Sequence, residues 1–280
     1  MNISTLVPEY VKEKHSSISS LAVGLMFASY QLVFLIVAPI LGDVLPKFGR
    51  RRSILYGSLM VSMATIVFAC GALFTNDNAF YAVSFVARCL QGGADALILV
   101  SVPSIIAVEW PEKNEKYQGY AGISMGLGLM LGPVLSSLLI RYLSYFWTLI
   151  VFAVLVLVLC TSATCFIPKR IDLDNSDTKE MVDVPYSNFL KNPRVVSVLI
   201  VDMLASMNLI FMDPILVLRL EDLGVNSDNA GFGFALMALT FTLGSGISGE
   251  LAEKFDKRVI ICSAMFGVGV ALWLAGGLYT

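Results

Sequence analysis

Charged residues are scarce in this sequence. Of its 280 residues, 14% are charged and 57% are hydrophobic, whereas soluble domains carry about 25% charged residues. So few polar side chains cannot cover a globule in water. The apolar residues are also grouped in long uncharged stretches, and a stretch of roughly 18 or more apolar residues is typical of a helix that spans a membrane. The composition therefore predicts an all-α membrane protein.

Residues for metal, disulfide or phosphate chemistry are also few or badly spaced. The five cysteines lie inside apolar stretches, without the spacing of a disulfide framework or a zinc site. The single histidine, His15, stands in a polar flank with no metal-ligand partner at helical spacing. The sequence has neither a Gly-x-x-x-x-Gly-Lys-Ser/Thr phosphate loop nor a Gly-x-Ser-x-Gly elbow. We therefore expect no metal, no cofactor, no nucleic-acid partner and no enzymatic activity.

Eight apolar stretches are long enough to form spanning helices. They lie at residues 20–41, 53–75, 79–108, 118–140, 145–167, 194–218, 229–249 and 259–279. The longest connection, residues 168–193, is too charged for hydrocarbon and is expected to be a central cytoplasmic loop. It divides the chain into residues 1–167, with five spans, and residues 194–280, with three.

Lysine and arginine gather in alternate connections, which indicates how the chain is oriented. The basic connections are 47–52, 113–116, 169–194 and 254–258, whereas the connection at 75–79 has no basic residue. By the positive-inside rule, the basic connections face the cytoplasm. Both ends of the chain are then expected on the opposite side. The N-terminus also lacks the layout of a cleavable signal peptide, because charged residues interrupt it from Glu9 onward.

A ten-residue pattern occurs twice, once in each part of the chain. Residues 42–51 follow the first span and residues 249–258 follow the seventh, and the two segments agree at Gly, at Lys-Phe and at the terminal basic residues. Related halves are typical of transporters. The alternative is that any cytoplasmic loop tends to be basic, but charge alone does not explain the Gly and Lys-Phe register.

With this repeat the chain resembles the major facilitator superfamily, whose loop pattern is Gly-x-Leu-Ala-Asp-Arg-x-Gly-Arg-Arg. Pro46 replaces the acid at the fifth position of the first copy, while Glu253 fills that position in the second. The resemblance implies that both segments act in gating. Their candidate gating residues are Gly42, Asp43, Gly49, Arg50, Arg51, Gly249, Glu253 and Arg258.

Two further motifs follow in the order that this family has them. Arg88-Cys-Leu-Gln91-Gly92 is similar to the Arg-x-x-Gln-Gly motif of the family's fourth helix, and a glycine series ending in Gly-Pro is similar to the motif of its proton antiporters. Glycines let two helix backbones approach, and a proline allows a bend. The resemblance implies that this packing also controls leakage and alternation of access. The residues concerned are Gly122, Gly126, Gly132 and Pro133.

Ionisable side chains inside the spans are the candidate coupling residues. Arg88, Gln91 and Asp95 are spaced i, i+3 and i+7, so they share one helix face. A charged side chain near the middle of a membrane span costs at least about 2.5 kcal/mol and is normally turned toward the interior of the helix bundle. Asp202 and Asp213 are spaced i and i+11, again nearly on one face. Two roles are open for these five residues. They form a relay for protons and substrate, or they are structural groups, such as a buried polar clamp between helices or a solvated helix end.

Asp213-Pro214 is similar to the acid-proline pair of the vesicular amine and polyamine transporters within this family. The resemblance implies a twelve-helix bundle of which this chain holds the second to the ninth helix. It also implies proton-coupled antiport of small organic cations (amines, polyamines or drugs) by alternating access. The expected partners are the cationic substrate, protons and the lipid bilayer, for a monomer in a vesicular or plasma membrane. The alternative is a truncated scaffold that does not transport.

Overall fold

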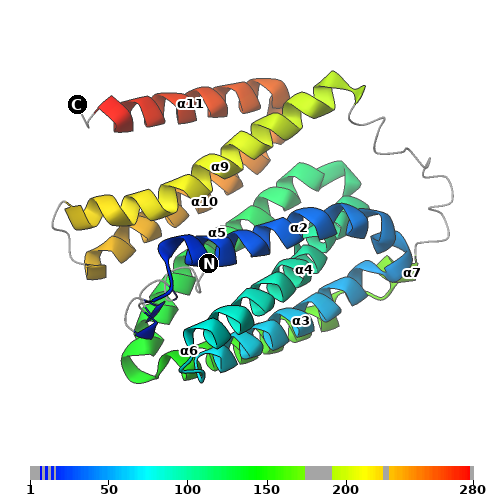
Figure 1. The fold of residues 1–280 in the computed structure, drawn as a ribbon. Helices are drawn as coiled ribbons and strands as arrows, with labels where there is room; N and C mark the ends of the chain where they lie inside the picture. The colour runs from blue at the N-terminus through cyan, green and yellow to red at the C-terminus, as the bar shows by residue number, and fades with distance from the viewer. Residues whose placement is uncertain are drawn as a thin grey trace. The chain divides into compact units, whose positions relative to one another are not determined.

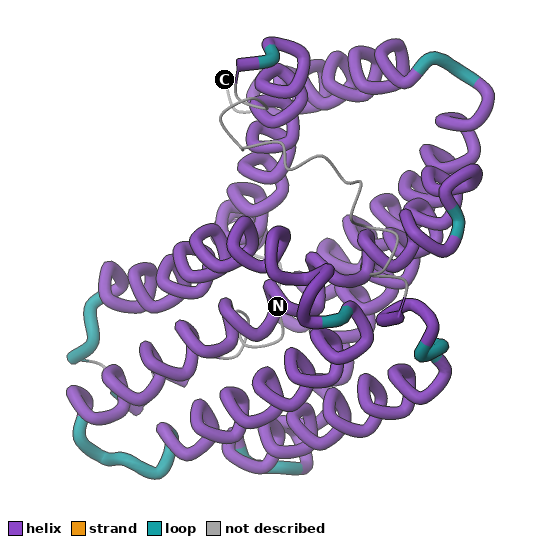
Figure 2. Tube along the Cα trace, turned by 90° about the vertical axis from the view of Figure 1, so that its right-hand side faces the viewer, coloured by secondary structure: helices purple, strands orange, loops and turns teal. Residues whose placement is uncertain are grey.

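The computed structural model describes residues 7, 10, 11, 14, 15, 17–173, 191–222 and 227–277. This part of the chain is helical and has no strands, which confirms the all-α prediction (Figures 1 and 2). The elements are α2 (Ser20–Phe48), α3 (Arg50–Gly71), α4 (Asp77–Glu109), η1 (Pro111–Lys113), α5 (Asn114–Tyr142), α6 (Tyr145–Phe166), α7 (Arg170–Leu173), α9 (Pro193–Asp222), α10 (Ser227–Lys254) and α11 (Lys257–Gly277). Each expected span coincides with one of the long helices.

Five helical segments in the described part are long and apolar enough to cross a membrane. They are Ser20–Phe48, Arg50–Gly71, Asp77–Glu109, Pro111–Ile140 and Tyr145–Phe166. Large apolar side chains are exposed along them, as in Leu35 at 68% and Trp147 at 57%. In lipid such an apolar surface is the favourable one, and a helix satisfies its own backbone polar groups there. The protein is therefore an integral, multi-pass membrane protein, and the crossing of α9, α10 and α11 stays a prediction.

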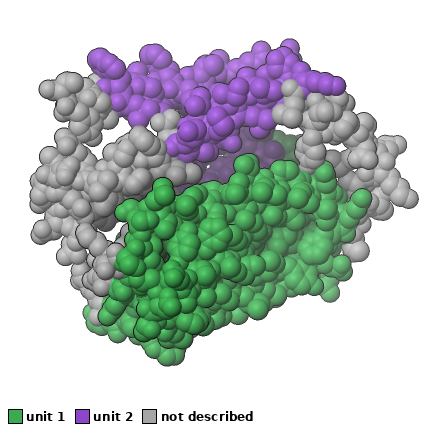
Figure 3. Space-filling view, viewed as in Figure 1, with its two compact units in different colours: residues 1–112, 132–180 green, residues 113–131, 181–280 purple. Residues whose placement is uncertain are grey.

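The chain forms two compact units, which are described separately. Unit 1 comprises Met1–Glu112 and Gly132–Glu180, and unit 2 comprises Lys113–Leu131 and Met181–Thr280 (Figure 3). The first stretch of α5 thus belongs with the later helices. The predicted boundary between two halves at residues 168–193 stays a prediction, and residues 174–190 of that connection lie outside the described residues.

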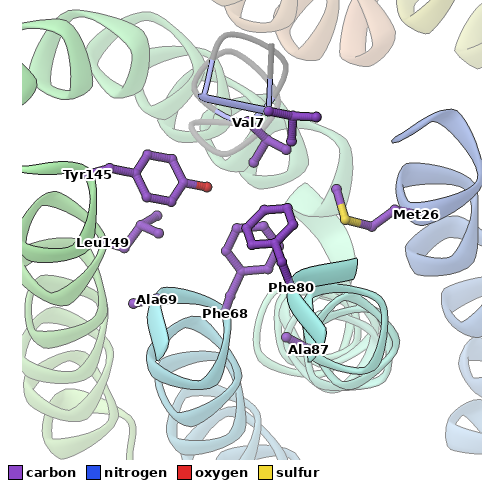
Figure 4. Packing of buried hydrophobic residues seen from close by; sticks show 9 residues of the cluster. Val7, Met26, Phe68, Ala69, Phe80, Ala87, Tyr145 and Leu149 are labelled. Carbon is purple, nitrogen blue, oxygen red and sulfur yellow. The ribbon is translucent and has the colours of Figure 1, made fainter. Parts of the chain in front are cut away.

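In unit 1 the helices pack in the order α2, α4, α3, α6, which follows from their pairwise contacts. Its core lies between these helices, where Phe68 and Phe80 meet (Figure 4). Tyr145 and Leu149 from α6 lie on one side of this pair, and Met26 from α2 on the other (Figure 4). This packing fixes α4 against α2 and α3, and so positions the motif that α4 carries.

The helix ends correct one expectation from the sequence. The first span was predicted to end at residue 41 and the second to begin at residue 53, which makes the repeated motif a loop. Instead α2 runs on to Phe48 and α3 begins at Arg50, so that Gly49 alone connects them. A hydropathy pattern marks where a helix leaves hydrocarbon, not where it ends, because a polar helix continues readily in water.

Gly49 makes this one-residue turn possible. Its φ is +99°, a value that side-chain-bearing residues rarely adopt. Its N–H still donates to the Leu45 carbonyl at 3.0 Å, which satisfies one carbonyl at the end of α2. At the opposite end of α2, the Ser19 hydroxyl accepts a hydrogen bond from the Ala22 N–H at 3.2 Å, as an N-cap.

Candidate functional site

Arg88 lies on α4 and is buried among aromatic side chains. Its guanidinium carbon lies over the ring of Phe27 from α2, 4.5 Å from the centroid, and 5.6 Å from the ring centroid of Phe68 on α3. Aromatic faces attract a cation, more strongly where water is excluded. Only 7% of the Arg88 surface is exposed, so rings from both neighbouring helices hold the guanidinium.

The hydrogen bonds of Arg88 leave part of its charge unpaired. Its Nη1 donates to Gln91 Oε1 at 3.3 Å, and Gln91 Nε2 donates to Thr65 Oγ1 on α3 at 3.0 Å. This relay explains the spacing of the Arg-x-x-Gln motif. However, Nε and Nη2 of Arg88 are buried and have no hydrogen-bond partner in the described part of the chain. Because buried N–H groups on a charged side chain are costly to leave unpaired, a further polar partner is expected there.

Asp95 lies two turns further along α4 and pairs with α2. The Tyr30 hydroxyl donates to Asp95 Oδ2 at 2.6 Å, and both residues are half-buried. Between them and Arg88 lies Gly92, where a Cβ would stand 2.3 Å from the Tyr30 carbonyl oxygen. The backbones of α2 and α4 therefore approach at a distance that only glycine permits. The final Gly of the motif is the crossing point of the two helices.

The glycine series of α5 forms a second close helix contact, within unit 2. A Cβ at Gly126 would stand 2.2 Å from Thr242 Oγ1 on α10, and one at Gly122 would stand 2.8 Å from Ser245 Cβ. One turn earlier, a Cβ at Gly119 would stand 3.0 Å from the Cα of Gly249, the first residue of the second motif copy. The packing role that the sequence predicts for Gly122 and Gly126 is thus present in the geometry.

Gly119 was not among the residues that the sequence singled out. It precedes Gly122 by three positions, so it continues the same helix face, and this spacing was the available signal. At the start of α11, Lys257 Nζ forms an ion pair with Glu115 Oε1 of α5. The contact between α5 and α10 thus runs from Gly119 to Gly126, and the ion pair joins α5 to the start of α11.

The α2–α3 turn is held by a group of polar side chains that we call the turn cluster, made up of Gly49, Arg50, Arg51 and Asp172. Arg50 is buried and donates from Nε to Ser104 Oγ on α4 at 2.8 Å. Arg51 donates from Nε to the Thr164 carbonyl of α6 at 2.8 Å. The two arginines of the motif therefore tie the turn to both neighbouring helices.

Asp172, in the short helix α7, supplies the helix-capping acid that the first motif copy lacks at Gly49. Its Oδ1 accepts a hydrogen bond from the Arg51 N–H at 3.0 Å. The N-cap of α3 is Gly49, which has no side chain to cap the helix. In the second copy Asp256 stands at the corresponding position and accepts from the Arg258 N–H at 3.0 Å with its own Oδ1. Both helices are therefore capped by a carboxylate: α3 by Asp172 from α7, and α11 by Asp256 from the motif itself.

His15, which stands in a polar stretch of the sequence, is buried, with 3% of its surface exposed. Its Nδ1 lies 2.5 Å from Asp77 Oδ1, and its ring stacks on Phe80 with centroids 4.3 Å apart. Asp77 thus pairs with the imidazole, and Phe80 covers it. No group of three or more metal-ligating side chains occurs among the described residues.

The remaining predicted residues are spread over the two units. Asp213 lies in α9, but its side chain is outside the described residues, as is that of Pro133 in α5. Gly132 is buried in α5. The exposed ones are Gly42, Asp43, Asp202, Glu253 and Arg258. The structure brings Arg88 and Gln91 together and places Asp95 beside Tyr30. The functional roles of all these residues stay predictions.

Comparison with known proteins decides the family. A family model described as the Major Facilitator Superfamily matches residues 1–280. The chain belongs to the Major Facilitator Superfamily. This confirms the resemblance drawn from the motifs and the major-facilitator fold, and it places the chain in a family of membrane transporters rather than of enzymes.

Several curated proteins of this facilitator family are similar to the chain. The vesicular acetylcholine transporter of Drosophila melanogaster is 26% identical over 249 residues, which cover 87% of this chain and 42% of that protein. The synaptic vesicular amine transporter of Homo sapiens is 26% identical over 256 residues, covering 89% of this chain and 47% of that protein. The chromaffin granule amine transporter of Rattus norvegicus is 23% identical over 255 residues, covering 89% and 46%. The chain spans about half the length of these relatives.

Proposed function

We propose that the complete protein exchanges protons for small organic cations by alternating access. The observation that carries this proposal is Arg88, a buried cation on the motif-bearing helix of a transporter fold, two of whose nitrogen atoms have no hydrogen-bond partner among the described residues. An ionisable residue inside a membrane span is costly and is normally retained for function. The similarity to transporters named for amines and acetylcholine supports an organic cation as the substrate class.

Carboxylates supply the exchange step in this proposal. A carboxylate in a low-dielectric site carries a costly bare charge, so it binds either a proton or an organic cation. Asp213 is the proposed coupling residue, with Asp202 on nearly the same face of α9 as the second acid. Occupation by the substrate then displaces the proton, and the reverse exchange on the other side of the membrane completes the cycle.

The contact between α5 and α10 and the turn cluster are the proposed parts that govern access. The glycine face of α5 against α10 leaves no side-chain-sized gap, which limits leakage along the contact. The turn cluster ties α2 and α3 to α4, α6 and α7 through hydrogen bonds that can form in one conformation and break in another. We propose a monomeric carrier in a vesicular membrane, and the match over residues 1–280 favours a carrier over a non-transporting scaffold.

Uptake into liposomes tests the proposal. The complete protein is reconstituted, an inside-acidic pH gradient is imposed, and the initial uptake of labelled tetraethylammonium and benzylamine is measured. Asp213→Asn should reduce this uptake at least about tenfold, because the amide neither releases a proton nor attracts a cation. Glu112→Gln, on the exposed η1 helix, should transport like the wild type.

Two outcomes contradict the proposal in different ways. Full uptake by Asp213→Asn would remove this acid from the coupling mechanism. Correctly inserted wild-type protein that takes up neither probe, with or without the gradient, would contradict organic-cation antiport itself and favour the scaffold.

A further inference from the structure

Asp95 has acceptor capacity that the described residues leave unused. Its hydrogen bond from Tyr30, at 2.6 Å on Oδ2, is the only one it makes in the part of the chain that the structure describes. A carboxylate has about four acceptor positions on its two oxygens. Asp95 is half-buried rather than sealed within unit 1. Within the described ranges, its other oxygen accepts no hydrogen bond.

Arg88 forms no hydrogen bond or ion pair with this carboxylate within the described ranges. It stands seven residues earlier on the same helix, which is about 10 Å along the axis. Its only hydrogen bond among the described residues goes to Gln91, which in turn donates to Thr65 on α3. Asp95 instead accepts from Tyr30 on α2. Within the described ranges Asp95 forms no ion pair. The face of α4 thus carries a positive and a negative group that do not contact each other in the described part of the chain.

The position of Asp95 is fixed by a close backbone contact between α2 and α4. Gly92 lies against the carbonyl of Tyr30, so the hydroxyl of Tyr30 is held within reach of Asp95. A carboxylate oriented in advance binds a ligand with less loss of conformational entropy than a free one. The tyrosine therefore acts as a positioning residue for the acid.

We propose that Asp95, oriented by Tyr30, binds the ammonium group of the transported cation. This assignment rests on the proposed function, since it gives that carrier a substrate contact in unit 1. A divalent metal is disfavoured because Ca²⁺ takes six to eight oxygen ligands, and one carboxylate with one phenol supplies too few. An organic ammonium ion needs only one carboxylate and tolerates the apolar surroundings of a membrane span.

Equilibrium binding to the purified complete protein tests the site, with labelled benzylamine and tetraethylammonium as probes. Asp95→Asn keeps an oxygen that accepts the Tyr30 hydrogen bond but removes the negative charge. It should raise the Kd for both probes on the order of ten- to a hundredfold, as expected for loss of a charged partner. Tyr30→Phe should raise the Kd about three- to tenfold through loss of orientation, and Asp95→Glu should bind more tightly than Asp95→Asn.

Matched controls separate binding from folding. Tyr56→Phe removes a hydroxyl from an exposed tyrosine on α3, and Glu112→Gln removes an exposed charge, so both should bind like the wild type. Wild-type affinity in Asp95→Asn, or no saturable binding by the wild type, would overturn the site. A loss of binding that follows a fall in the unfolding midpoint, in Asp95→Asn and Asp95→Glu alike, would identify a structural pair and overturn it too.

The liposome assay distinguishes this inference from the proposed function. Probe binding that depends on Asp95, without gradient-driven uptake, contradicts antiport and supports the ammonium site. Gradient-driven uptake with the same KM in the wild type and in Asp95→Asn overturns the ammonium site and leaves antiport standing.

Discussion

At the scale of single residues, Gly92 has little room for change. A Cβ there would stand 2.3 Å from the Tyr30 carbonyl oxygen, which is backbone and cannot rotate away. At the next position, Gly93, a Cβ would stand 3.7 Å from a Val33 side-chain carbon, an ordinary contact. The two adjacent glycines therefore differ in what they permit.

We predict that Gly92→Ala destabilises the protein by about 1–3 kcal/mol, the usual cost of overpacking a close contact, and weakens the alignment of Tyr30 with Asp95. Gly93→Ala should be neutral or slightly stabilising, because alanine is the better helix former. Thermal unfolding of the purified protein in detergent measures both variants. Equal midpoints for the two would contradict the close approach of α2 and α4.

The residues of this site could be predicted from the sequence only where they belong to a motif or share the spacing of one helix face. Arg88, Gln91 and Asp95 share a face of one helix, and the spacing alone gives that. Tyr30 and Thr65 were not predicted, because which residues of α2 and α3 face α4 depends on where the helices cross. Asp172 was hidden among the other charges of the central connection, where a capping acid has no sequence signal of its own.

At the scale of helices, the two copies of the repeated motif cap the helix that follows the turn in two different ways. Each joins two helices by a short turn, and the second helix needs an acceptor for its first N–H groups. In the second copy Asp256 is that acceptor. In the first copy Gly49 provides the backbone conformation, and Asp172 provides the oxygen.

This comparison predicts the effect of removing each cap. Asp172→Ala and Asp256→Ala should each cost about 0.5–2 kcal/mol of stability, the usual loss for an N-cap replaced by alanine. Asp256→Gly should cost only a few tenths of a kcal/mol by the same scale. Chemical or thermal unfolding in detergent measures the series. If Asp172→Ala were silent, its hydrogen bond to the Arg51 N–H would not cap α3.

The contact between α5 and α10 yields a second prediction at this scale. Gly126→Ala should slow transport and destabilise the protein by about 1–3 kcal/mol, since its Cβ would meet Thr242 at 2.2 Å. Gly128→Ala, two positions away, meets nothing within 4 Å and should be neutral on both readouts. Uptake rate and unfolding midpoint are measured in parallel. Comparable defects in both variants would indicate general helix distortion in place of a specific contact.

Helix positions were predictable because apolar stretches are a strong signal, but their ends were not. The repeated motif was expected as a loop at residues 42–52, and all of it except Gly49 is helical up to Arg52. Charge in this segment reports its exposure to water and not its backbone conformation. A local pattern therefore locates the membrane boundary more reliably than the helix boundary.

At the scale of the whole molecule, the alternation of basic connections makes a testable statement about topology. α4 has 33 residues, about 50 Å at the helical rise, which exceeds a hydrocarbon thickness of about 30 Å. If α4 crosses the membrane, the connections at its two ends, near Thr75 and near Glu112, lie on opposite sides. From Glu112 to Lys254 the chain passes through α5, α6, α9 and α10, and four crossings return it to the same side.

Single cysteines introduced into a variant without the five native ones test this arrangement. All three positions are exposed, so cysteines at Glu112 and Lys254 should react with a membrane-impermeant maleimide from the cytosolic side, and one at Thr75 only from the opposite side. Labelling of the Thr75 and Glu112 cysteines from one side would mean that α4 does not cross. Labelling of the Lys254 cysteine from the side of Thr75 would mean that one of the four intervening helices fails to span. That result would undo the orientation assigned to the second motif copy, because its basic residues would then face away from the cytosol.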